Sequence, residues 1–307
     1  MRKLGKLLSD HFKEDLHIPY YITVILFIIL GLGINYTIDL ENSIIDKPYN
    51  NPWRILWYFL LYSLAYYGTI SILYYFKKVT FVFDRRFWLI SLTGIIVLAI
   101  NTGFPFLYTT VRLFIENYKL ASWAYQTCSN LISFLFITIP LLLISRYWIK
   151  DNNTHLGLNA RITIKPYLQL LALIIPLISI AVFERGLGSY YPTYKSNTVA
   201  PFVDWPSWIP MVIYECAYAI DFFNVELFFR GFLVIGLSHL MGKETIIPMV
   251  TTYCFLHFGK PLGEAVSSVI GGYILGVIAL YTRNIWGGVI LHIGVAWTME
   301  IAAWLSK

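Results

Sequence analysis

The sequence predicts an all-α protein, a polytopic membrane helix bundle of about eight or nine transmembrane helices. Of its 307 residues, 58% are hydrophobic and only 13% are charged, whereas soluble domains carry about 25% charged residues. Apolar runs near or above ~18 residues recur along the chain, and that length crosses a bilayer. We therefore expect an integral, multi-pass membrane protein that lies in the lipid bilayer.

Nine apolar segments are candidates for these helices. They are about 20–36, 53–76, 88–108, 121–148, 167–183, 209–235, 245–258, 264–281 and 285–305. The seventh is short, at ~21 Å against a ~30 Å hydrocarbon core, and it ends at Gly259-Lys260-Pro261. A helix broken at membrane depth must lie inside protein or beside a wet cavity. We expect this segment to end within the membrane.

The basic residues indicate the orientation. The net charge is +6, and Lys and Arg gather in residues 1–18, in the loop 77–86 and in the connector 146–165, which includes Arg161. The intervening loops carry few of them. By the positive-inside rule this places the N-terminus, residues 1–19, in the cytoplasm. No basic cluster interleaved with aromatic residues occurs outside the apolar segments, so no nucleic-acid partner is expected.

Two charges of opposite sign, one turn apart, lie in the largely apolar run from Ile209 to Ile235. Glu226 and Arg230 are four residues apart, so on a helix they share a face and can pair. A charge at the centre of a membrane helix costs roughly 2.5–3.5 kcal/mol and should have a partner inside the protein. This is either a structural ion pair or part of a functional site.

Two histidines favour a functional site, because His257 and His292 each lie in a further apolar segment. Neither has a second ligand at i+3 or i+4, and HExxH and GxSxG are absent, so neither a zinc site nor serine catalysis is favoured. We expect no metal and no cofactor. The three cysteines, Cys128, Cys216 and Cys254, are interpreted as buried small hydrophobic residues.

Taken in order, these residues resemble the CAAX protease and bacteriocin-processing family (CPBP, or Abi) of intramembrane endopeptidases. Its motifs are EExxxR, FxxxH and HxxxN or HxxxD. Here they read Val225-Glu226-Leu-Phe-Phe-Arg230, Tyr253-Cys-Phe-Leu-His257 and His292-Ile-Gly-Val-Ala296. The resemblance covers roughly Pro201–Ala303. It divides the chain into N-terminal transmembrane helices (20–200) and a catalytic-type core (201–307).

The resemblance implies a glutamic-type, metal-independent endopeptidase whose substrate is a membrane-associated or prenylated-type protein or peptide. In the family, the first Glu and the second-motif His activate a water, and the third-motif His and its Asn stabilise the oxyanion. Here Val225 replaces that Glu and Ala296 replaces the Asn or Asp. The residues carried over as catalytic are Glu226, His257 and His292, with Arg230 in a supporting role.

Three carboxylates are candidates for the missing base. Glu226 is adjacent to the vacated position, but its pairing with Arg230 would weaken it as a base. Asp221 lies one turn before Val225 on the same face, and Glu264 follows His257 by seven residues. Glu264 also suits the N-terminus of the eighth helix, where the dipole favours a negative charge.

Three hypotheses follow. The first is an active endopeptidase; the second is a catalytically silent relative that acts as a binding or immunity scaffold. The third, a transporter with a buried ion pair, has less support because no inverted repeat is visible. A carboxylate within hydrogen-bond reach of His257 would favour the enzyme, and Val225 and Ala296 facing a cavity without one would favour the scaffold.

Overall fold

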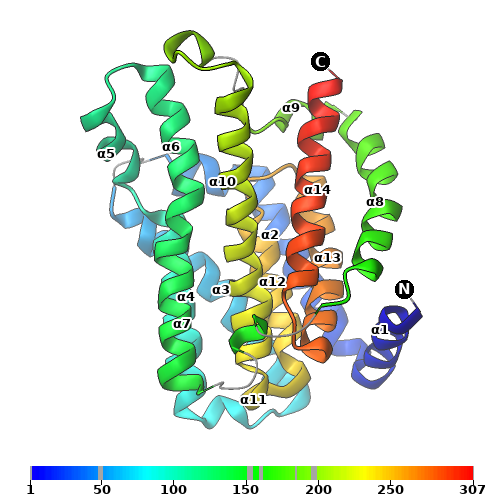
Figure 1. Cartoon of the computed structure of the whole chain (residues 1–307). Helices are drawn as coiled ribbons and strands as arrows, with labels where there is room; N and C mark the ends of the chain where they lie inside the picture. Colours follow the sequence, from blue (N-terminus) through cyan, green and yellow to red (C-terminus); the bar gives the residue numbers. More distant parts are fainter. Residues whose placement is uncertain are drawn as a thin grey trace.

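A computed structural model describes residues 2–47, 51–150, 155–158, 162–183, 185–194 and 199–306. Over these residues the chain is helical and contains no strand. The α-helices are α1 (Arg2–Asp15), α2 (Ile18–Ile38), α3 (Trp53–Lys77), α4 (Arg85–Gly103), α5 (Leu107–Phe114), α6 (Tyr118–Ser133), α7 (Ile139–Ile144), α8 (Lys165–Phe183), α9 (Arg185–Tyr190), α10 (Trp208–Glu226), α11 (Ser238–Met241), α12 (Ile246–Leu256), α13 (Leu262–Thr282) and α14 (Trp286–Leu305) (Figure 1). A π-helical segment, Leu227–Gly236, continues α10 directly.

Seven helical stretches of the described chain are long and apolar enough to cross a membrane. They are α2, α3, α4, the continuous stretch Tyr118–Ile149, α8, α13 and α14. Each coincides with a predicted segment, so the polytopic all-α bundle is confirmed. The two other predicted segments correspond to α10 with its π-helical continuation and to α12, which has only 11 residues.

The third predicted segment, about 88–108, extends too far. Helix α4 ends at Gly103, Phe104 is extended, and α5 starts a new helix at Leu107. The cause is Pro105, because a proline disfavours helical geometry in the residue before it. At the other end the Asp84 side chain accepts a hydrogen bond from the backbone N–H of Arg86 and caps the helix.

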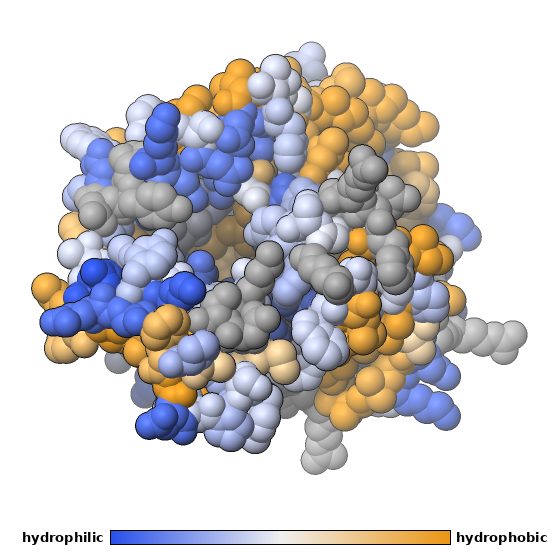
Figure 2. All heavy atoms as spheres, turned by 90° about the horizontal axis from the view of Figure 1, so that it is seen from above, coloured by the Kyte–Doolittle hydropathy of each residue, from blue (hydrophilic) through white to orange (hydrophobic). Residues whose placement is uncertain are grey.

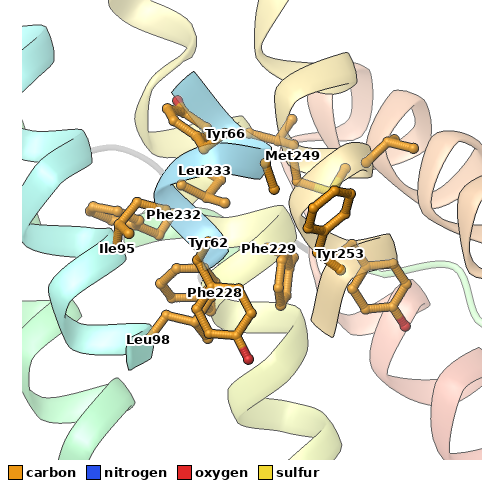
Figure 3. Close-up of a cluster of buried hydrophobic side chains, with 14 of the residues drawn as sticks. Tyr62, Tyr66, Ile95, Leu98, Phe228, Phe229, Phe232, Leu233, Met249 and Tyr253 are labelled. Atoms are coloured by element: carbon orange, nitrogen blue, oxygen red, sulfur yellow. The ribbon is translucent and has the colours of Figure 1, made fainter. Parts of the chain in front are cut away.

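Helix α12 lies at the centre of the bundle. Every residue from Ile246 to Phe255 is buried, as expected for a helix that is apolar on all sides. Gly272 and Gly276 let α13 approach it: a Cβ on Gly276 would lie 2.6 Å from Met249 Cε, and one on Gly272 would lie 3.1 Å from the Tyr253 ring. Figure 3 shows the core where α12 meets α3, α4 and the π-helical segment.

The exterior is largely apolar, as a lipid-facing bundle requires. Large exposed hydrophobic side chains occur on most of the long helices, and in the view from above hydrophilic residues cover much of the end of the bundle while hydrophobic ones gather towards the rim (Figure 2). The prediction of three buried cysteines is wrong for two of them. Cys128 and Cys216 are exposed on this outer surface, and only Cys254 is buried.

One end of the bundle carries a buried ion-pair cluster. Lys77, at the end of α3, pairs with Asp15 of α1 at 2.8 Å and with Glu244 at 2.9 Å. Lys243 lies 3.6 Å from the same aspartate. These contacts fasten α1 to the end of the bundle that also bears the basic loop 77–86. Arg161 of the predicted basic connector lies outside the described residues.

Candidate active site

Glu226 and Arg230 form the buried ion pair that the sequence predicts. Glu226 ends α10, Arg230 lies in the π-helical segment, and the distance from Arg230 Nη1 to Glu226 Oε1 is 3.0 Å. Their side chains are 0% and 1% exposed, and all ten residues of the π-helical segment are buried.

Glu226 also holds His292, which α14 brings alongside α10 (Figure 1). Its Oε1 lies 3.1 Å from His292 Nδ1. The approach depends on Gly288, because a Cβ there would lie 2.1 Å from Glu226 Oε2. A carboxylate oxygen can only accept, so His292 donates from Nδ1 and, as a neutral imidazole, presents Nε2 as an acceptor.

Tyr253 connects the two histidines. Its hydroxyl lies 3.1 Å from His292 Nε2, and its ring centroid is 4.5 Å from that of His257 and 6.1 Å from that of His292. His257 Nδ1 lies 2.8 Å from the Tyr253 carbonyl. A carbonyl can only accept, so His257 donates from Nδ1 and its Nε2 is free to accept a proton.

The first transmembrane helix fixes the loop that follows His257. Asn35 of α2 donates to the Phe258 carbonyl at 2.9 Å, and Tyr36 donates to the Lys260 carbonyl at 2.6 Å. Just beyond α2, buried Glu41 lies against Gly259. Glu41 is outside the seven membrane-spanning stretches, and burial raises its pKa to about 8.

A cavity of about 960 Å³ opens between α4, α6, α8, α10 and α12–α14. Most of its wall is apolar, and the residues carried over from the family motifs that line it are Val225, Arg230, His257, His292 and Ala296. Glu226 is not among the lining residues. It contacts two lining residues, His292 and Arg230.

The two other candidate carboxylates, Asp221 and Glu264, both line the cavity. Glu264 is already engaged: its Oε1 lies 3.4 Å from Lys260 Nζ, and its Oε2 accepts from the Tyr191 hydroxyl at 2.8 Å. Among the described residues, His257 makes no hydrogen bond to a carboxylate. The vacated motif positions therefore face the cavity, and no carboxylate replaces the first Glu directly at His257.

Sequence reasoning missed Tyr253 and Lys260. Tyr253 occupies the aromatic position of the second motif, where the family has Phe, and that departure was the available signal. Lys260 lines the cavity beside Tyr190 and Tyr191, with Nζ 5.2 and 5.6 Å from their ring centroids. Its position in the Gly259-Lys260-Pro261 break was visible in the sequence. Within the described part of the chain, no three His, Cys, Asp or Glu side chains group closely enough to hold a metal ion.

Comparison with known proteins agrees with this geometry. Residues 206–298 match the family model described as type II CAAX prenyl endopeptidase Rce1-like. Compared with curated proteins and with solved structures, the chain gives no match. The matched segment contains Glu226, Arg230, Tyr253, His257 and His292. The resemblance read from the three motifs is thus confirmed: residues 206–298 are similar to the Rce1-like (CPBP) family.

Proposed function

We propose that the protein is a membrane-embedded, metal-independent endopeptidase that cleaves a membrane-associated or prenylated-type protein or peptide. The observation that carries the proposal is the state of His257. Its Nδ1 is committed to the Tyr253 carbonyl, and the ring lines the cavity beside the His292–Glu226 pair. A positioned imidazole with a free lone pair is a competent general base.

In the proposed reaction, a water in the cavity gives a proton to His257 Nε2 as its oxygen attacks the peptide carbonyl. The tetrahedral oxyanion then collapses, the C–N bond breaks, and His257 returns the proton to the leaving amine. Glu226 orients His292 through Nδ1 and stays beside Arg230. This assigns Glu226 a positioning role.

The family's water-activating carboxylate is missing, so turnover of the native protein should be weak or absent. Val225 lines the cavity one position before Glu226, and Val225→Glu restores a carboxylate there. Supplying a general acid or base typically changes rates by about 10²–10⁴-fold. We expect a gain of that order for the purified variant in detergent, assayed with a peptide library.

Asp221→Asn and Glu264→Gln serve as the comparison set. If the native protein is robustly active and Val225→Glu leaves that activity unchanged or abolishes it, another group already serves as the base. The variant of these two that then loses activity while remaining folded identifies that group. His257→Ala should abolish cleavage in every background. Cleavage that survives His257→Ala would contradict the proposal.

A second candidate function, a silent scaffold that binds a membrane protein or peptide, is supported by Val225 and Ala296 lining the cavity. It predicts that neither the native protein nor Val225→Glu cleaves any member of the library, while a peptide still binds in the cavity. Binding without cleavage in both proteins would favour the scaffold over the enzyme.

We also propose that the N-terminus, residues 1–19, is cytoplasmic. The clustering of Lys77, Lys243 and α1 at one end of the bundle supports this orientation, because basic residues concentrate on the cytoplasmic side. A reporter that is active only outside the cytoplasm, fused to the N-terminus, should be inactive. Activity of that fusion would reverse the topology.

A further inference from the structure

Tyr253 departs from the second motif in a way that adds one functional group. A Phe at this position would supply the ring alone. Tyr253 lines the cavity, and its additional hydroxyl lies 3.1 Å from His292 Nε2. The third motif departs in the opposite sense, since Ala296 removes a polar side chain from a wall of the same cavity. One hydrogen-bonding group is gained near His292 and one is lost.

The hydrogen between Tyr253 and His292 belongs to the tyrosine. Glu226 Oε1 already lies 3.0 Å from the Arg230 guanidinium and 3.1 Å from His292 Nδ1. A carboxylate oxygen can only accept a hydrogen bond, so His292 donates from Nδ1 to Glu226. With the hydrogen on Nδ1, the neutral ring leaves Nε2 as the acceptor for the Tyr253 hydroxyl.

We propose that the Tyr253 hydroxyl is the oxyanion donor of this site, in place of the amide lost at position 296. The inference rests on the proposed endopeptidase function. When the carbonyl carbon becomes tetrahedral, the Tyr253 O–H turns from His292 Nε2 to the carbonyl oxygen. No covalent bond to Tyr253 forms or breaks in this step.

The surroundings of Tyr253 suit a fixed donor. The guanidinium carbon of Arg230 lies 4.4 Å from the Tyr253 ring centroid, so a cation–π contact helps to hold the ring in place. Gly272 leaves only enough room for the ring, because a Cβ there would lie 3.1 Å from Tyr253 Cδ1. A donor that is held in place before the reaction stabilises the transition state without reorganisation.

The test uses Tyr253→Phe, which restores the family motif and retains the ring, made in the Val225→Glu background. Losing one oxyanion donor typically lowers kcat by about 10²–10³-fold. We expect that loss with little change in KM, because the hydroxyl acts only in the transition state. Adding Ala296→Asn should recover at least part of the lost kcat. Tyr66→Phe, which removes a buried hydroxyl from a residue outside the cavity lining, is the matched control and should leave kcat unchanged.

Each other outcome has one meaning. A kcat within about threefold of the parent, against the expected 10²–10³-fold loss, overturns the inference while the proposed function stands. So does a loss expressed in KM, or one that Ala296→Asn does not reverse, because Tyr253 would then act in binding or folding. If neither the native protein nor Val225→Glu cleaves any peptide, the proposed function itself fails and the inference fails with it.

Discussion

Gly288→Ala tests the contact on which the whole site depends. The new Cβ would lie 2.1 Å from Glu226 Oε2 and 2.8 Å from Cδ, whereas ordinary contact begins at 3.4 Å. Either α14 or the carboxylate must therefore move by about 1 Å. Movement of α14 is overpacking, at about 1–3 kcal/mol. Movement of the carboxylate stretches the 3.1 Å contact with His292. The loss in free energy of unfolding then approaches that of an unpaired buried charge, about 3–5 kcal/mol.

The measurement is thermal unfolding in detergent, followed by tryptophan fluorescence, together with peptide cleavage in the Val225→Glu background. We expect Gly288→Ala to unfold at a lower temperature and to lose cleavage. Gly33→Ala in α2 is the control, since its Cβ meets nothing within 4 Å and alanine is favoured over glycine in a helix by roughly 0.5–1 kcal/mol. If the two variants prove equally stable and active, the close packing of α14 on Glu226 is refuted.

Two further predictions concern buried charges. Arg230→Ala leaves Glu226 buried without its cation and should lower the free energy of unfolding by about 3–5 kcal/mol; the double variant with Glu226→Gln should recover part of that loss, and a single variant as stable as the native protein would contradict the ion pair. Burial raises the pKa of Glu41 to about 8 from its usual 4.5, so the folded state holds this proton more tightly than the unfolded state. Stability from Glu41 is therefore complete below about pH 4.5 and is lost as the pH rises through about 8. Glu41→Gln should make the unfolding midpoint depend less on pH between these two values. If the midpoint of the variant changes with pH as steeply as that of the native protein, Glu41 is not the source of the dependence.

The sequence was sufficient for the membrane bundle and for the Glu226–Arg230 pair, because both follow from hydrophobicity and helical spacing. The sequence was not sufficient to predict that Glu226 lies outside the cavity lining. Spacing places that side chain on the Arg230 face, but whether it faces the cavity depends on Gly288 and on how closely α14 packs, a contact 62 residues away in the chain.

The motifs also drew attention to only one of the two residues that define the second motif, although both line the cavity. In Tyr253-Cys-Phe-Leu-His257 the histidine has the obvious chemistry, whereas the tyrosine passes as an aromatic packing residue. Its role depends on the 3.1 Å approach of His292 from α14, which no local pattern contains. The helix boundary at Pro105 could be predicted from local geometry, whereas the exposure of Cys128 and Cys216 could be seen only in the packed bundle.

Helix α2 holds the loop after α12 through two hydrogen bonds. The chain therefore cannot be divided near residue 201, the boundary that the motifs suggest, without losing these contacts. Residues 206–298 match the family model, yet the carbonyls of Phe258 and Lys260 receive their hydrogen bonds from Asn35 and Tyr36. A fragment that starts near residue 201 would keep every motif and still leave these carbonyls without their α2 donors. Helix α2 therefore belongs to the structure that holds the loop after His257, although it lies outside residues 206–298. Separately expressed halves should regain a native site only when both are present in the same membrane.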